Sequence, residues 1–409
     1  MAKKAKTDSF ETELSAFQGH LLNKIDKIPL AITSRLADLG IGDAEQLAAA
    51  ASVSGTRESL IDYLQISDRE LDAIIQSATS AIPRSVASNI ESEQQPLSLG
   101  GLEPTEEILA EMQAMMTPTP VTLDVAALPV NVNYALQMPA IRNQGGRGTC
   151  VAFSMTAVHE FYRIRQGIPQ DFSEQFLYHE TKLIDGHPAT CGTWQVKAAQ
   201  VLTNTGECRE AIWPYNPSGT CNNNGVEPAN ARADASTRKV QTIILNPKDV
   251  NAIKAALAGG ALVGISVPVW NSWYLSAETK RTGRITMRIG SEASAGGHAM
   301  CCVGYQDDAN SPGGGFFILR NSWGTGWAYQ SPYGAGYGTI PYAYIATQNW
   351  EAVTTPPGRR IIRPVWDWKK WKVNPWPFGE EGQEGQGENE AETKTIFIDA
   401  GPNVNIVIR

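Results

Sequence analysis

Residues 142–154 read RNQGGRGTCVAFS, a glycine-rich loop that runs directly into an apolar segment. The apolar pattern continues to residue 166 and Gly167 can end a helix, so the sequence predicts a helix over residues 150–166. Cys150 then stands at the N-terminus of that helix, where the helix dipole and free backbone amides stabilise a thiolate. The side chain of Gln144, six residues earlier, is a hydrogen-bond donor that can reach the same point.

Two later segments supply partners for such a thiol. Residues 295–305, AGGHAMCCVGY, place His298 at the start of an apolar strand, from which its ring can project into a cleft. Residues 316–324, FFILRNSWG, end a second strand at Asn321. An asparagine amide oxygen can orient a histidine ring, and Trp323 can shield that hydrogen bond from water. A thiol nucleophile, an imidazole base and an orienting amide are the parts of acyl-transfer catalysis.

These three segments resemble those of the papain-like cysteine peptidases. Residues 172–175 (FSEQ) and 206–215 (GECREAIWPY) resemble further segments of the family. Gly192 and Thr193 lie where many members have a Gly-Gly pair that binds the substrate backbone. The resemblance covers about residues 128–348, just over half of the chain.

The resemblance implies a role for each site residue. Cys150 would be the nucleophile, His298 the base and later the acid, and Asn321 the orienting residue. Gln144 and the Cys150 amide would form the oxyanion hole. The expected substrate-binding residues are Gly192, Thr193, Gly297 and Trp323. No metal ion and no cofactor are expected.

Three positions depart from the family pattern. Arg147 replaces a cysteine that forms a disulfide in many members, which is consistent with a reducing compartment. Val151 replaces the usual aromatic residue after the nucleophile, which loosens one wall of the cleft. Thr193 replaces the second glycine of the substrate-backbone pair, which affects the unprimed side of the cleft. None of these changes removes a catalytic atom.

The expected fold class is α+β: a two-lobed papain-like domain preceded by a small all-α domain. One lobe would be helical with Cys150 at a helix start, and the other a β-barrel-like sheet carrying His298 and Asn321. The cleft between them would take an extended peptide. Residues 128–350 are assigned to this peptidase domain.

Residues 1–82 predict the all-α domain, with four or five short helices closed by Pro83. Asp43 with Gln46, and Ser67 with Glu70, have capping-box spacing. Residues 36–41 (LADLGI) resemble helix-hairpin-helix modules, some of which bind DNA. However, residues 1–80 hold 8 basic against 12 acidic residues, and the glycine pair of a DNA-binding hairpin is missing. We therefore expect a docking or inhibitory role with a protein partner.

The remaining segments are assigned by composition. Residues 83–127 form a Ser/Pro/Thr-rich linker or pro-segment with one short helix near 106–116. Residues 351–378 form a Trp-rich basic tail, 379–394 an acidic low-complexity linker, and 395–409 a hairpin.

Overall composition narrows the class of protein. The 409-residue chain carries a net charge of −8, which argues against nucleic-acid binding. No apolar run is long enough to span a membrane, and none follows the basic start, so we expect a cytoplasmic protein, with non-Sec export left open. The six cysteines contain no Cys-x-x-Cys pair, so zinc has little support, and one disulfide among Cys191, Cys208 and Cys221 stays open.

The leading hypothesis is a cysteine endopeptidase that forms an acyl-enzyme and is made as a zymogen cut within residues 83–130. A transacylase or peptide ligase on the same site is the alternative within enzymes. A catalytically silent adaptor that binds through its N- and C-terminal extensions is the alternative from another class.

Overall fold

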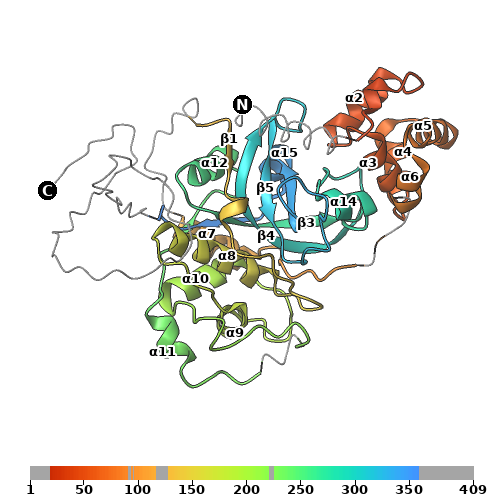
Figure 1. Cartoon of the computed structure of the whole chain (residues 1–409). Helices are drawn as coiled ribbons and strands as arrows, with labels where there is room; N and C mark the ends of the chain where they lie inside the picture. The colour runs from red at the N-terminus through yellow and green to blue at the C-terminus, as the bar shows by residue number, and fades with distance from the viewer. Residues whose placement is uncertain (1–18, 91–93, 95, 117–127, 221–224, 359–409) are drawn as a thin grey trace, which may run out of the picture.

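The computed structural model describes residues 19–90, 94, 96–116, 128–220 and 225–358. These residues form a helical lobe, a sheet lobe and an N-terminal helical domain (Figure 1). The expected two-lobed α+β architecture is confirmed. Most of the Trp-rich tail, from residue 359 on, lies outside the described residues, as do the acidic linker and the predicted hairpin.

The sheet lobe is built on a seven-stranded sheet with antiparallel pairing, within the described residues. Its strand order is β2-β7-β3-β4-β5-β6, with β1 paired to β4. The strands are β1 (Asn131–Asn133), β2 (Ile243–Ile244), β3 (Val263–Trp270), β4 (Ser294–Asp307), β5 (Gly315–Arg320), β6 (Tyr337–Pro341) and β7 (Glu351–Thr354). Strand β7 continues the sheet past residue 350, where the domain boundary is predicted; that boundary stays a prediction.

Strand β4 carries His298, and its register places the histidine at the middle of the sheet. His298 lies opposite Val267 of β3, and Cys301 lies opposite Arg320 at the end of β5. Strand β3 is buried along its whole length, as expected of a central strand covered on both faces. Asn321 directly follows β5, so the sheet brings the histidine and the asparagine to one edge of the cleft.

The helical lobe is organised around α8 (Cys150–Arg165), which confirms the predicted helix over 150–166. Residues 150–161 of this helix are all buried, because it packs against both lobes. Gly167 follows with φ of 76°, a left-handed conformation that suits a residue without Cβ after a helix end. The other helices of this lobe are α9 (Glu174–Ile184), α10 (Gln195–Asn204) and α11 (Ala231–Ser236).

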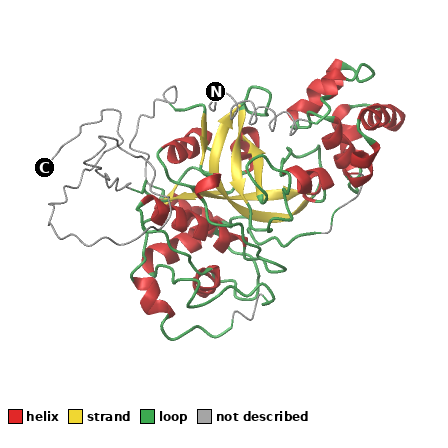
Figure 2. Ribbon diagram, viewed as in Figure 1, coloured by secondary structure: helices red, strands yellow, loops and turns green. Residues whose placement is uncertain are grey.

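Short helices connect and cover the strands (Figure 2). They are η3 (Ala135–Gln137), α12 (Val250–Ala258), α13 (Asn271–Tyr274), α14 (Ala277–Thr282) and α15 (Tyr342–Gln348). No helix among the described residues is both long and apolar enough to cross a membrane.

The N-terminal domain is helical, as predicted. It consists of η1 (Leu22–Lys24), α2 (Leu30–Asp38), α3 (Ala44–Ala51), α4 (Thr56–Leu64), α5 (Asp68–Ala81) and α6 (Arg84–Ile90). Ser67 and Glu70 form the full capping box, and the Asp43 side chain accepts the Gln46 N–H. Helix α6 begins directly after Pro83, so the proline starts a further helix instead of closing the domain; its rigid φ suits a helix start.

Between this domain and the two-lobed domain lies an extended segment, residues 96–103, which we call the strap. Helix α7 (Glu106–Met115) follows it and packs on α10, in agreement with the short helix predicted near 106–116. The apolar residues Ile108 and Met112 of α7 join the core around α8. The linker is therefore partly ordered against the two-lobed domain.

Candidate active site

Cys150 is the first residue of α8, and its side chain is completely buried. Thr149, the residue before it, makes no side-chain cap, so the amides of the first turn stay available to other acceptors. The Cys150 Sγ accepts the Ala299 N–H at 3.4 Å. Since Ala299 follows His298, the fold brings the predicted nucleophile of one lobe next to the histidine of the other.

The His298 ring is held from two sides. Its Nε2 lies 2.8 Å from Asn321 Oδ1, and the Trp323 ring stacks on it with centroids 4.2 Å apart. The Asn321 oxygen also accepts the Ser322 N–H at 2.8 Å, which fixes the amide orientation. With Nε2 bound to an acceptor, the neutral ring carries its proton there. Nδ1 is left as the basic nitrogen, and it is buried without a hydrogen-bond partner.

Gln144 is anchored on the far side of the nucleophile. Its Nε2 donates to Arg147 O at 2.7 Å and to Ser98 O at 3.1 Å, while its Oε1 accepts from Ser322 Oγ at 2.6 Å. The side chain therefore presents its N–H groups, not its oxygen, toward the strap. This is the orientation that an oxyanion donor needs.

Both titratable groups of the site are held neutral. Burial raises the pKa of the Cys150 thiol to about 12, although backbone amides of Ala299, Gly100 and Val151 favour the thiolate. Burial likewise lowers the pKa of His298 to about 4, against the opposing effect of the Asn321 hydrogen bond. A neutral thiol beside a neutral imidazole is a resting arrangement and not a reactive one.

The strap packs over this part of the site. Ser98 O accepts N–H groups from Gln144 and from Trp323 Nε1, each at 3.1 Å. Further along, Gly100 N and Gly101 N both donate to Gly297 O, at 3.1 and 3.0 Å. The strap therefore crosses the cleft directly over Cys150.

The other end of the strap pairs with the loop before α10. Gly101 and Thr193 form a parallel bridge, in which Thr193 N donates to Gly100 O at 3.0 Å and Leu102 N donates to Thr193 O at 3.1 Å. The Leu102 side chain lies over Gly192, where an added Cβ would come within 2.6 Å of it. All four residues predicted to bind substrate, Gly192, Thr193, Gly297 and Trp323, thus contact the strap. Their roles toward a substrate stay predictions.

Sequence reasoning missed the strap and two residues that support the site. Ser322 was quoted only as part of a motif, yet its hydroxyl orients Gln144. The Tyr215 hydroxyl donates to Gln144 O at 2.8 Å and lies 2.7 Å from Thr149 Oγ1. The signal for the strap was the Gly100-Gly101 pair within a Ser/Pro/Thr-rich segment.

Arg147 holds the nucleophile loop by polar contacts. It is 2% exposed and donates to Gln175 Oε1 at 2.7 Å and to Asn216 O at 2.9 Å. Its guanidinium also lies over the rings of Tyr178 and Tyr215, at 5.2 Å from each centroid. Arg147 therefore connects the loop to the helical lobe without a covalent bond.

The cysteines divide into two groups. Cys150, Cys208, Cys301 and Cys302 are free and buried. Cys191 is disulfide-bonded. The disulfide that the sequence left open therefore involves Cys191 and excludes Cys208.

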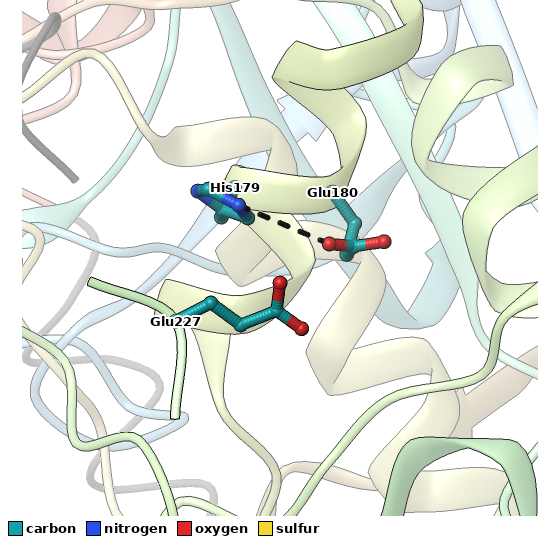
Figure 3. Close-up of side chains that lie close together, drawn as sticks. All are labelled: His179, Glu180 and Glu227. Atoms are coloured by element: carbon teal, nitrogen blue, oxygen red, sulfur yellow. Dashed lines mark ion pairs between the residues drawn. The ribbon is translucent and has the colours of Figure 1, made fainter. Parts of the chain in front are cut away.

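One cluster of possible metal ligands lies in the helical lobe. His179, Glu180 and Glu227 bring ligand atoms within 4.8 Å of one another (Figure 3). Arg232, however, already pairs with both carboxylates, at 2.7 Å to Glu180 Oε1 and 3.0 Å to Glu227 Oε1. A metal ion would have to displace this guanidinium, so we interpret the cluster as an ion-pair network that ties residue 227 to α9. The expected absence of a metal stays a prediction.

A buried thiol beside a histidine held by an asparagine, on a two-lobed α+β fold, is the arrangement expected of a thiol-dependent acyl-transfer enzyme. The model of the family described as papain family cysteine protease matches residues 128–340. The solved structure of xylellain, a cysteine protease from Xylella fastidiosa, is similar with a TM-score of 0.53 and 25% identity. That match covers 64% of this chain and 97% of xylellain.

Two curated relatives match about half of this chain. Ananain from Ananas comosus is 29% identical over 213 residues, which are 50% of this chain and 55% of ananain. An uncharacterised peptidase C1-like protein of Acanthamoeba polyphaga mimivirus is 27% identical over 216 residues, which are 51% of this chain and 66% of that protein. The matches thus span between 55% and 66% of these relatives' own length. The chain belongs to the papain family of cysteine peptidases.

Proposed function

We propose that this chain is a cysteine endopeptidase that is made in a self-inhibited form and converted by its own activity. The observation that carries the proposal is the strap, which covers a complete set of catalytic groups. Each proposed catalytic residue makes a hydrogen bond at the site: Gln144, Cys150, His298 and Asn321. Cys150 and His298 nevertheless have no exposed surface.

The groups present support the following cycle once the strap leaves. His298 Nδ1 takes the Cys150 proton, and the sulfur attacks the peptide carbonyl carbon to form a C–S bond. The oxyanion is held by Gln144 Nε2 and the Cys150 amide. The imidazolium then gives its proton to the leaving amine as the C–N bond breaks, which leaves an acyl-enzyme. Water, deprotonated by His298, releases the acid and restores the thiol.

The backbone groups that now hold the strap fit an extended peptide substrate. Thr193 offers one N–H and one C=O, and Gly297 offers a C=O. These groups can form hydrogen bonds with the main chain of a substrate, whatever its side chains are, so they suit a peptidase that acts on protein substrates. Conversion would require a cut within residues 83–130, which includes the stretch between α7 and the peptidase domain.

Replacing Gly100 with alanine should open the cleft. An added Cβ would lie 2.1 Å from Gly148 O and 2.8 Å from Gly148 Cα, both of which are backbone atoms that cannot move aside easily. Overpacking of this kind destabilises a packed state by about 1–3 kcal/mol. We therefore expect the full-length chain to cleave a fluorogenic peptide about 5–30-fold faster at early times, before any processing.

The matched control is Gly326→Ala, because Gly326 is exposed and an added Cβ there meets nothing within 4 Å. It should leave the initial rate unchanged. An initial rate for Gly100→Ala equal to that of the parent chain would show that the strap does not limit activity.

Acid should also open the cleft. In the closed form the pKa of His298 is about 4, and on opening it returns toward its ordinary value of 6.5. Between these values the open form binds a proton that the closed form does not. The equilibrium constant for closure of the strap is therefore highest above pH 6.5. It falls by up to about tenfold per pH unit as the pH is lowered toward 4.

The readout is hydrogen exchange of the strap amides in the Cys150→Ala chain, corrected for the intrinsic pH dependence. Protection at Gly100 and Gly101 should fall between pH 6.5 and 4, and His298→Asn should remove most of that fall. Protection that is constant across this range would contradict the assignment of His298 as the titrating group.

The location of the protein stays a proposal. We propose cytoplasmic synthesis, as the sequence favoured, while the disulfide at Cys191 favours a step in an oxidising environment.

A further inference from the structure

The N-terminal helical domain and the sheet lobe each contribute a side chain to the apolar core of the other. Val53, which follows α3, is 2% exposed and belongs to the apolar cluster of the sheet lobe. Ile289, from the loop before β4, is fully buried and belongs to the apolar cluster of the helical domain. Each body thus completes the core of the other, which is typical of permanent interfaces more than of transient ones.

A buried ion pair crosses the same surface. Arg284 of the sheet lobe pairs with Asp43 of the helical domain and, at 3.0 Å, with Glu278 of α14. The Asp43 and Glu278 side chains are each 1% exposed. Asp43 also caps α3 of the helical domain. The charge of this capping carboxylate is therefore balanced by Arg284 of the sheet lobe.

The backbones of the two bodies also meet. Met287 N donates to Leu39 O at 2.8 Å. Gly290 has φ of 53°, and a Cβ there would lie 3.1 Å from Ser59 O. The backbones of the two bodies therefore approach closely at that point. Helices α3 and α6 pack beside α14, as the right side of Figure 1 shows.

The strap is held in a different way. In the interactions described above for residues 98–101, the strap uses its main-chain N–H and C=O groups, which a substrate backbone can replace. Those of the helical domain combine the Met287–Leu39 main-chain hydrogen bond with interlocked side chains that have no substitute in a substrate. Removing the strap therefore does not require the helical domain to leave.

We infer that residues 19–90 stay bound to the peptidase domain after the chain is cut, so that the working enzyme is a complex of two pieces. This inference rests on the proposed function and concerns what remains after conversion. The docked surface is residues 283–292 with α14, and its partner is the chain's own helical domain.

The docked surface leads directly to the catalytic histidine. Residues 283–292 join α14 to β4, and β4 carries His298. With the helical domain removed, Ile289 would lose its apolar surroundings and Arg284 its Asp43 partner. Retention of the domain keeps the segment before the catalytic strand in place.

The test uses the full chain carrying Cys150→Ala, with a recognition sequence for a site-specific protease inserted within residues 91–93. After cutting by that added protease, the two pieces should elute together on size exclusion and appear as a 1:1 complex in native mass spectrometry at about 1 μM. Separate elution of the pieces at that concentration would overturn the inference. Because the chain is catalytically inactive, this result is independent of the proposed peptidase activity.

Variants then locate the surface. Arg284→Gln leaves Asp43 without its cation, which typically weakens a buried contact by at least about 30-fold in Kd. Arg57→Gln is the matched control, because Arg57 pairs only with exposed carboxylates of its own domain, at Asp68 and Asp72. Ile289→Ala tests the apolar contact should Arg284→Gln fail to fold. Unchanged Kd in both interface variants would show that another surface holds the domain.

Discussion

Replacing Cys150 with alanine should lower peptide cleavage to the level of the uncatalysed control, a loss of about 10⁴–10⁶-fold in kcat. In the proposed cycle, the thiol sulfur is the atom that bonds to the substrate carbon, and its loss removes the nucleophile. Both forms should be compared in the Gly100→Ala background, so that the strap does not mask the difference. Intact-mass spectrometry should show loss of an N-terminal piece, ending within residues 83–130, in the Cys150-containing chain alone.

Cys208→Ala provides the control, since Cys208 is also buried but lies in a separate apolar cluster with Phe176 and Trp213. It should retain full activity. Equal cleavage by the Cys150→Ala chain would refute the nucleophile assignment. If the Cys150-containing chain neither cleaves peptides nor reacts with a thiol-directed epoxide faster at Cys150 than at its other cysteines, the adaptor hypothesis becomes the better one.

Replacing His298 with alanine should lower kcat by about 10³–10⁴-fold near neutral pH, which is in the upper part of the usual range for loss of a general base. In the proposed cycle the ring takes the thiol proton through Nδ1, while Asn321 holds Nε2. Without the ring, the thiol must ionise unaided. The remaining activity should therefore rise with pH toward the ordinary thiol pKa of about 8.5.

His179→Ala is the matched control, because His179 lies in the helical lobe against Trp213 and away from the cleft. It should leave the pH profile unchanged. A His298→Ala chain with the parent pH profile would show that another group removes the proton.

The catalytic centre was predictable because its signals are local. A glycine-rich loop before an apolar run predicted the start of α8, and the predicted helix end at Gly167 agrees with the structure. His298 and Asn321 were predicted at the two ends of apolar strands, and the antiparallel sheet brings both strands side by side. Resemblance to one family then gave each residue its role.

The strap was not predictable in the same way. Its main-chain hydrogen bonds to Gly297 and Thr193 leave no periodicity in the sequence, and its Ser/Pro/Thr-rich surroundings are typical of a linker. The glycine pair was the one usable sign, because only a residue without Cβ can pass so close to Gly148.

The docking of the helical domain was equally hidden. Val53 and Ile289 are separated by more than two hundred residues, and each fits the apolar pattern of its own segment. Only the folded chain shows that they exchange cores. Helix α6 after Pro83 was hidden for a related reason, since a proline is as compatible with the start of a helix as with its end.

The use of Arg147 in place of a half-cystine has a consequence for redox behaviour. A thiol peptidase needs reductant to keep its nucleophile from being oxidised, and the same reductant would open a cystine that anchors the loop before that nucleophile. Here the loop before Cys150 is anchored by a guanidinium held between two tyrosine rings, which no electron donor can cleave. A reducing environment that keeps the Cys150 thiol active would therefore leave the Arg147 anchor of its loop intact.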